Sequence, residues 1–295
     1  MADTDTPTFH LGITMAGAVS AGAYTAGFMD YLLEALERWE EKKAHNREVG
    51  KGGQGYDPTV PMHDVVIDVL GGASAGGMVG MITALSTYAK MPPVHSPSDT
   101  PTGNILYDSW VLLDDDVDST LPNPEMTFEK MLHTQDLGAD GGGVKSLLNS
   151  RPIDAIADRV FEQLVPQEKQ RPRPPYISED LHVLMTLCSI RGVPFEVKFN
   201  TFSSAKFPYS PGHRMHEHMI VAHFKWRYKT ARDQDLYLKF DPYDPEAAGL
   251  MKLCTKATGA FPIGLEMRQF QGKLSKEYVK NSILRNLDIQ DPNAV

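Results

Sequence analysis

Cysteine is scarce in this sequence, and long apolar runs are absent. The 295 residues include two cysteines, Cys188 and Cys254, which cannot form a disulfide framework and which fit a reducing compartment. No stretch reaches the roughly 18 uninterrupted apolar residues that a membrane span requires. The N-terminal residues carry acids where a secretory signal peptide would carry bases. We therefore expect a cytoplasmic protein with no transmembrane segment.

Positive charge is also in short supply. The chain has 29 lysines and arginines against 38 acidic residues, which gives a formal net charge of −9. Such a balance argues against nucleic acid, and against electrostatic adhesion to anionic membranes, as a main partner. The hydrophobic content of 41% is that of an ordinary globular protein. The length suits one large domain, and we assign residues 1–295 to a single domain.

Strands and helices alternate in the N-terminal part of the chain. Residues 9–15 and 63–70 have the composition of strands, and the second run is nearly continuous in β-branched residues, as in a parallel strand buried on both faces. Helical patterns follow over residues 28–41 and 75–90, and the polar, glycine-rich segment 44–61 should end the first of them. This order predicts an α/β fold with a parallel sheet. The apolar positions expected on the buried face of the first helix are Phe28, Met29, Leu32, Leu33, Leu36 and Trp39.

The remainder of the chain continues the mixed pattern, without internal repeats or low-complexity tracts. We predict helices over residues 105–113, 128–133, 153–164 and 244–261, and strands over residues 181–190, 194–202, 219–228 and 235–240.

Ser74 stands at the point where the second strand must turn into the following helix. A serine hydroxyl is a poor nucleophile unless a base takes its proton and donors stabilise the oxyanion that forms. A tight strand-to-helix turn exposes such a serine, and its neighbours must be small because a Cβ would clash with adjoining elements. Gly72, Ala73, Ala75 and Gly76 therefore predict a nucleophile elbow around Ser74. The alternative is a packing turn in which the serine only caps the helix.

A second loop of small residues, at positions 17–22, follows the first strand. Small side chains let backbone N–H groups approach a ligand, and the loop opens a helix, which is how an oxyanion hole or anion cradle is built. A dinucleotide-type turn is disfavoured because the G-x-G-x-x-G spacing is absent. Both loops follow predicted strands, at the carboxyl ends where open α/β sheets build their sites.

The chain resembles the patatin-like phospholipases in these two loops. That family carries a glycine-rich oxyanion loop after its first strand and a G-x-S-x-G elbow after the next, as residues 11–36 and 63–85 do here. Asp68 stands where many members also have an aspartate. Residues 146–161 resemble a helix of bacterial members, and residues 255–267 resemble the small-residue segment that precedes their catalytic aspartate. The resemblance implies a three-layer αβα sandwich with a mostly parallel central sheet.

By this resemblance the protein is a serine acyl hydrolase that cleaves fatty-acyl esters of lipids or phospholipids. Ser74 would attack the ester carbonyl, an aspartate would act directly as base, and water would release the fatty acid. Backbone amides near Gly17, Ala18 and Val19 would hold the oxyanion, although the loop at 17–22 lacks the family's Arg or Lys. The implied partner is a lipid or ester substrate, including one presented at a membrane surface. No cofactor and no metal are implied.

The catalytic aspartate is the main departure from the family pattern. In the family it lies in an Asp-Gly turn after the segment that residues 255–267 match. Beyond that segment the chain offers only Asp288 and Asp291, and neither precedes a glycine. The sole Asp-Gly is at Asp140, which comes too early in chain order and is the second choice for the base. We therefore expect a C-terminally truncated patatin-like domain whose catalytic aspartate lies beyond Val295.

Two other functions stay open. An ordinary α/β-hydrolase would use a Ser-His-Asp triad, and His213 to His223 follow the elbow in the required order. That fold usually has several strands before its elbow, however, and only one is predicted here. The other alternative is a catalytically inactive protein that binds a lipid or a partner. His216 and His218 share one face of an extended strand, but no Cys or carboxylate completes a metal site there.

Overall fold

A sheet of five strands organises the part of the chain that the structure describes. The computed structural model describes residues 7–18, 21–112, 127–134, 143–164, 171–198, 212–291 and 295. The strands lie across the sheet in chain order: β1 (Thr8–Met15), β2 (Asp64–Ala73), β3 (Ile177–Lys198), β4 (Gly212–Lys225) and β5 (Leu238–Lys239). β1, β2 and β3 are parallel to one another, β4 is antiparallel to β3, and β5 is parallel to β4. The sheet is therefore mostly parallel, as the sequence predicts.

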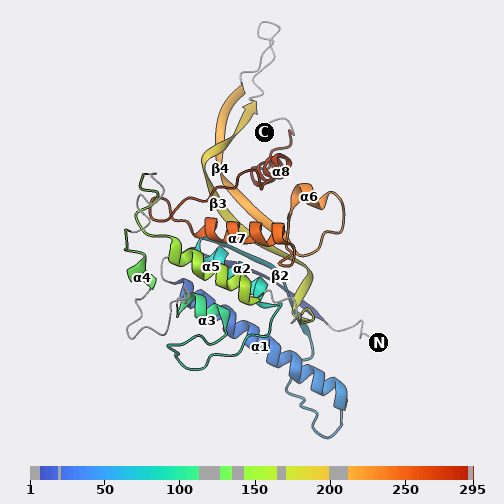
Figure 1. Cartoon of the computed structure of the whole chain (residues 1–295). Coiled ribbons are helices and arrows are strands. Elements are labelled where there is room, and N and C mark those ends of the chain that lie inside the picture. Colours follow the sequence, from blue (N-terminus) through green and yellow to red (C-terminus); the bar gives the residue numbers. More distant parts are fainter. Residues whose placement is uncertain are drawn as a thin grey trace.

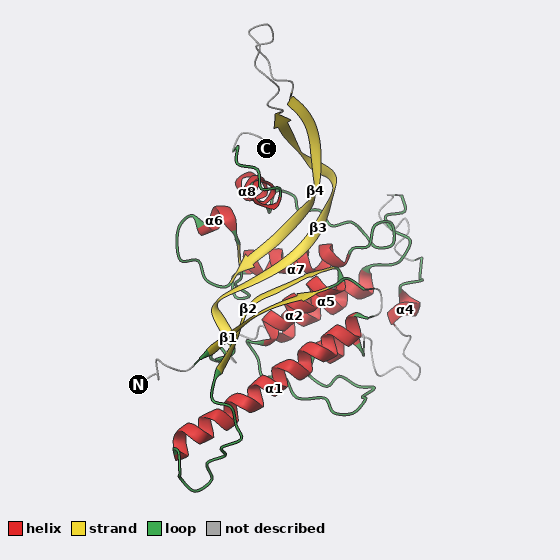
Figure 2. Cartoon of the chain, turned by 180° about the vertical axis from the view of Figure 1, so that it is seen from behind, coloured by secondary structure: helices red, strands yellow, loops and turns green. Residues whose placement is uncertain are grey.

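Helices cover one face of this sheet. α1 (Gly22–Val49) and α2 (Ala75–Ser86) follow β1 and β2 and belong to the crossovers that parallel strands need. The others are α3 (Ile105–Trp110), α4 (Thr127–Lys130), α5 (Arg151–Leu164), α6 (Asp233–Leu236), α7 (Pro245–Gly259) and α8 (Lys276–Asn286). Figure 1 shows α1, α2, α3, α5 and α7 on one side of the strands, and Figure 2 shows the sheet in front of them, with α6 and α8 beside β4. The α/β class is confirmed. A three-layer form needs helices on both faces of the sheet, and the described helices that cover it lie on one side, so the predicted three-layer, patatin-like form is not shown.

Alternation along β3 distinguishes the two faces of the sheet. Leu181, Val183 and Met185 are buried, whereas Thr186 and Cys188 are exposed, as the two-residue period of a strand requires. α2 is buried along almost its whole length and forms the centre of the helical layer. Within the residues described, no helix combines the length and the apolar character needed to cross a membrane.

α1 differs from the sequence prediction in two ways. Met29, Leu33 and Leu36 face the core, but Phe28 is 55% exposed. Neighbouring residues of a helix point about 100° apart, and in this helix it is Met29 that faces the core while Phe28 points outward. The helix also continues to Val49, beyond the end that the sequence predicts.

Buried polar side chains account for the longer helix. Lys43 is fully buried, and its ammonium group binds the carboxylates of Glu40 (2.6 Å) and Asp64 (2.5 Å). The side chain of Asn46 bonds both the backbone N–H and the C=O of Asp57. The last turns of α1 are therefore tied to the segment that leads into β2, in a stretch whose polarity alone predicts a loop.

β3 and β4 extend beyond the other strands as a two-stranded ribbon (Figures 1 and 2). The strands predicted over residues 181–190 and 194–202 are parts of one strand as far as it is described, with an irregularity between Cys188 and Val193. Gly192 lies in this irregularity with φ 69°, a conformation that glycine adopts without strain. Because β3 is parallel to β2, the ribbon extends beyond the sheet on the side where the carboxyl end of β2 lies.

Tyr278 closes the free edge of β4. Its hydroxyl accepts a hydrogen bond from the His223 N–H (2.9 Å) and donates one to the Val221 C=O (2.7 Å). The Tyr278 side chain is 1% exposed, and this burial raises the pKa of its hydroxyl. One side chain of α8 thus satisfies two backbone groups that a neighbouring strand would otherwise bond.

Replacing Tyr278 by phenylalanine should lower the free energy of unfolding by about 1–3 kcal/mol, because it leaves the His223 N–H and the Val221 C=O without their partner. Urea unfolding followed by circular dichroism measures the change. Tyr31→Phe is the matched control, since Tyr31 is 73% exposed. Equal stability of the two variants would show that the Tyr278 hydroxyl does not hold this edge.

Candidate active site

Ser74 is a single residue between β2 and α2, and its backbone is strained. Its φ and ψ are 51° and −124°. A non-glycine residue in such a region costs about 1–3 kcal/mol and persists only where its surroundings fix it. Residues of this kind concentrate at functional sites. The structure thus has, at Ser74, the sharp strand-to-helix turn that a nucleophile elbow requires.

Glycines allow the turn to pack against neighbouring backbone. A Cβ on Gly76 would overlap the carbonyl group of Met15 at the end of β1, and a Cβ on Gly72 would overlap the backbone of Gly76. A Cβ on Gly77 would lie 2.9 Å from the hydroxyl oxygen of Thr258. Any larger residue would push these backbones apart, so the glycines of the turn are a packing requirement.

The Thr258 hydroxyl holds the backbone of Ser74. It accepts a hydrogen bond from the Ser74 N–H (3.0 Å) and donates one to the Thr186 C=O (2.8 Å). The hydroxyl therefore bridges α7, β3 and the turn. Thr258 is not among the residues that the sequence predicts for the site. Nothing in the sequence distinguishes a bridging hydroxyl from any other helical threonine.

The loop after β1 reaches the Ser74 turn. β1 and β2 are parallel neighbours, so their carboxyl ends lie side by side. A Cβ on Gly17 would lie 3.1 Å from the Cβ of Ser74. The structure therefore brings together the first residue of the predicted oxyanion loop and the predicted nucleophile. Ala18 follows Gly17 in the described part, whereas Val19, the third predicted oxyanion residue, lies outside it.

No base contacts Ser74 in the described part of the chain, where the hydroxyl forms no hydrogen bond with a carboxylate or a histidine. Asp140, the second choice for the base, lies outside the described residues. Asp288 lies in the turn that follows α8. The Asp68 carboxylate is hydrogen-bonded to Nδ1 of His10 at 2.6 Å. The predicted nucleophile and the glycine loop therefore lie side by side, whereas no predicted base is found beside Ser74 among the described residues.

His223, a candidate for the triad of an α/β-hydrolase, bonds another histidine. Nδ1 of His182 and Nε2 of His223 lie 2.8 Å apart, and the Tyr237 ring packs edge-on against both imidazoles. Burial, together with the charges of His182, Arg285 and Lys225, lowers the pKa of His223 to about 3. Burial also lowers the pKa of His182. The two imidazoles therefore form a neutral pair near pH 7.

The ribbon carries the two histidines that the sequence places on one strand face. Nδ1 of His218 is hydrogen-bonded to the Ser189 carbonyl oxygen at 2.7 Å, and His216 lies beside Gly192. No three His, Cys, Asp or Glu side chains among the described residues are grouped so that they could hold a metal ion.

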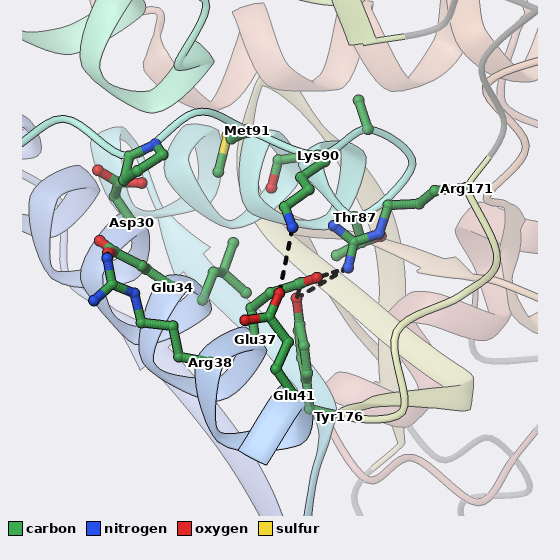
Figure 3. Close-up of a pocket in the computed structure, with 14 residues that line it drawn as sticks. Asp30, Glu34, Glu37, Arg38, Glu41, Thr87, Lys90, Met91, Arg171 and Tyr176 are labelled. Carbon is green, nitrogen blue, oxygen red and sulfur yellow. Dashed lines mark hydrogen bonds and ion pairs between the residues drawn. The ribbon is translucent and has the colours of Figure 1, made fainter. Parts of the chain in front are cut away.

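A pocket with charged walls lies between α1 and the segment after α2 (Figure 3). Glu37 accepts hydrogen bonds from Arg171 (2.6 Å) and Tyr176 (2.9 Å), and Lys90 binds Glu41 (3.4 Å). Burial alone would raise the pKa of Glu37, but these hydrogen bonds lower it below its ordinary value. The pocket adjoins the C-terminal end of α2, whereas the strained turn is at the N-terminal end. It is therefore separate from the candidate active site.

Replacing Gly76 by alanine should lower the free energy of unfolding by about 1–3 kcal/mol, because the new Cβ forces the turn away from the end of β1. Gly249→Ala is the matched control, since it lies in α7 with nothing within 4 Å of its Cβ position. That change should raise the stability by roughly 0.5–1 kcal/mol. Thermal or urea unfolding measures both, and an equally stable Gly76→Ala variant would contradict the packing requirement.

The His182–His223 pair should make stability depend on pH. The pKa of His223 is about 3 in the folded chain, against an ordinary value of 6.5. Between pH 6.5 and 3 the unfolded chain therefore binds a proton at His223 that the folded chain does not bind. The contribution of His223 is therefore complete above pH 6.5 and declines as the pH falls toward 3. Urea midpoints between pH 7.5 and 5 should decline less in His223→Gln than in the unmodified chain. The exposed His213, changed to Gln, is the control and should leave the decline unchanged.

Comparison with known proteins gives one relative and no family. No family model matches the chain, and no solved structure matches it. A Sinorhizobium fredii (strain NBRC 101917 / NGR234) protein named "Uncharacterized protein y4iI" is 37% identical over 207 residues. The aligned region covers 68% of this chain and 26% of that protein. The chain therefore spans about a quarter of the length of the curated relative that it matches, and the relative's name carries no activity.

Proposed function

We propose that this protein is a serine acyl hydrolase that cleaves fatty-acyl esters of lipids, with Ser74 as its nucleophile. The observation that carries the proposal is the strained conformation of Ser74 between a parallel strand and a helix, beside the Gly17 loop. A serine that only caps a helix does not need a positive φ. The resemblance to patatin-like phospholipases supplies the substrate class.

The hydrogen bond to Thr258 limits where the oxyanion donors can come from. The Ser74 N–H is already bound to the Thr258 hydroxyl. The first N–H groups of α2, from Ala75 onward, have no partner within the helix and carry the positive end of its dipole. Together with backbone amides of the Gly17 loop, these groups would stabilise the charge that develops on the ester oxygen. The loop lacks Arg and Lys, so the proposed stabilisation comes from backbone alone.

An aspartate is the base in this proposal, by the family resemblance. His223 does not act as the base in this proposal, because its Nε2 is hydrogen-bonded to Nδ1 of His182. Asp140 is the aspartate of this chain that precedes a glycine, as the family's base does. Its role is testable independently of the role of Ser74.

The Ser74→Ala variant should lose labelling by a fluorophosphonate probe and lose hydrolysis of p-nitrophenyl butyrate by about 10⁴-fold or more. The assays use residues 1–295 and the protein expressed from its whole reading frame. Ser178→Ala is the control, because Ser178 lies near the start of β3, at the opposite end of the strands from the Ser74 turn. Labelling or turnover that survives in Ser74→Ala would refute the assignment of the nucleophile.

The base is tested in whichever form is active. Asp140→Asn should lower the rate as severely as Ser74→Ala if Asp140 completes the dyad, while leaving the unfolding midpoint unchanged. Full turnover in Asp140→Asn would move the base to another aspartate. It would leave the role of Ser74 intact.

A further inference from the structure

The outward face of α1 changes character along the helix. Tyr24, Phe28 and Tyr31 follow one another at helical spacing and are 81%, 55% and 73% exposed. The charged residues of α1 before Arg38 are only partly exposed, whereas from Arg38 to Val49 the exposed residues are mostly charged. We call the three residues Tyr24, Phe28 and Tyr31 the aromatic stripe.

Three exposed aromatic side chains on one helix face call for an explanation. A contiguous apolar patch on a protein surface marks an interaction site more often than chance. Tyrosine is enriched at lipid–water boundaries, where its ring enters the apolar region and its hydroxyl stays hydrated, and a phenylalanine ring adds apolar surface that can be buried there. The exposed residues in the last turns of the same helix are mostly charged, so exposure to solvent does not by itself account for the three aromatic rings.

The aromatic stripe lies at the end of α1 that is nearer to the candidate active site. α1 begins five residues after Gly17, whose Cβ position is 3.1 Å from Ser74 Cβ. A second group of exposed apolar side chains follows α7, the helix whose Thr258 holds the Ser74 backbone. Its members are Phe261, Ile263 and Met267, and the Ile263 carbonyl accepts a hydrogen bond from the backbone of Leu147, which is itself 74% exposed. Apolar side chains are therefore exposed on both segments that adjoin the Ser74 turn.

The charge of this surface selects the kind of lipid. Between Gly22 and Tyr31 the helix has no Lys or Arg, and its one acid, Asp30, accepts a hydrogen bond from Asn104. The whole chain carries a net charge of −9. A helix face without cations, on an acidic protein, does not suit anionic lipids, whose binding depends on Lys and Arg. It suits a lipid surface with no net charge.

We propose that the aromatic stripe docks this protein on a zwitterionic lipid surface, with the Ser74 turn facing that surface. The inference rests on the proposed function, because a lipid hydrolase must receive its substrate from such a surface. Docking would bury the three rings in the boundary region, and binding scales with the apolar area that is buried. Hydrolysis of a small ester dissolved in water would not require the stripe.

The test is binding of the whole protein to phosphatidylcholine vesicles, measured by flotation. The triple variant Tyr24→Ser, Phe28→Ser, Tyr31→Ser should lower the partition coefficient by about tenfold or more. It should keep the unfolding midpoint and keep turnover of p-nitrophenyl butyrate within about twofold. Phe9→Ser is the matched control, because Phe9 is 61% exposed near the start of β1, away from the Ser74 edge, and its vesicle binding should be unchanged.

Several results would overturn docking by the stripe. One is equal vesicle binding by the triple variant and the unmodified protein. Another is binding to vesicles containing phosphatidylserine but not to pure phosphatidylcholine. A third is a change in molar mass by light scattering when the stripe is replaced, since the stripe would then join two protein surfaces. Ser74→Ala separates the two proposals: it should bind vesicles normally, and if it also kept its esterase activity, only the proposed function would fall.

Discussion

The two hydrogen bonds of the Thr258 hydroxyl are the contact on which the arrangement of the candidate site depends. They join the Ser74 N–H to the Thr186 C=O, and so they fix the strained turn to β3 from the side of α7. On the other side the turn rests against the backbone of Met15, through a glycine. Segments separated by more than 200 residues thus converge on one residue. A positive φ at Ser74 is kept because these contacts are made simultaneously, each of them removing a way for the turn to relax.

Parallel pairing of β1 and β2 extends this constraint to the glycine loop. Because the two strands run in the same direction, the loop after β1 and the turn after β2 open at the same edge of the sheet. Gly17 can then approach Ser74 closely, which a residue with a Cβ could do only by crowding it. The N-terminus of α2 points at the same place. Ser74, bare backbone and a helix dipole are thereby gathered at one site. In the proposed hydrolase, backbone groups alone would stabilise the oxyanion.

α1 meets two different requirements along its length. Its inward face packs on the core through Met29, Leu33 and Leu36, and near its end Lys43 and Asn46 anchor it to the segment before β2. This anchoring fixes the helix at the end far from the candidate site. Among the described residues, the outer side of the near end, where the aromatic stripe lies, forms no such anchoring bond. The helix can therefore present a surface beside the site without giving up its own packing.

The sequence by itself determined the order of the first two strands and the helices that follow them, and the position of the glycine-flanked turn; it divided β3 into two strands and did not predict α8. Periodicity and the need for small residues at a tight turn are local properties, and they are visible in a single segment around Ser74. Tertiary structure decided which residues meet across the chain: that Thr258 holds the turn, that Phe28 faces outward, and that His223 bonds His182 rather than Ser74. In each of these cases several residues of the same kind were available. Which one makes the contact is set by helix rotation and strand register, and these are fixed only when distant segments pack together.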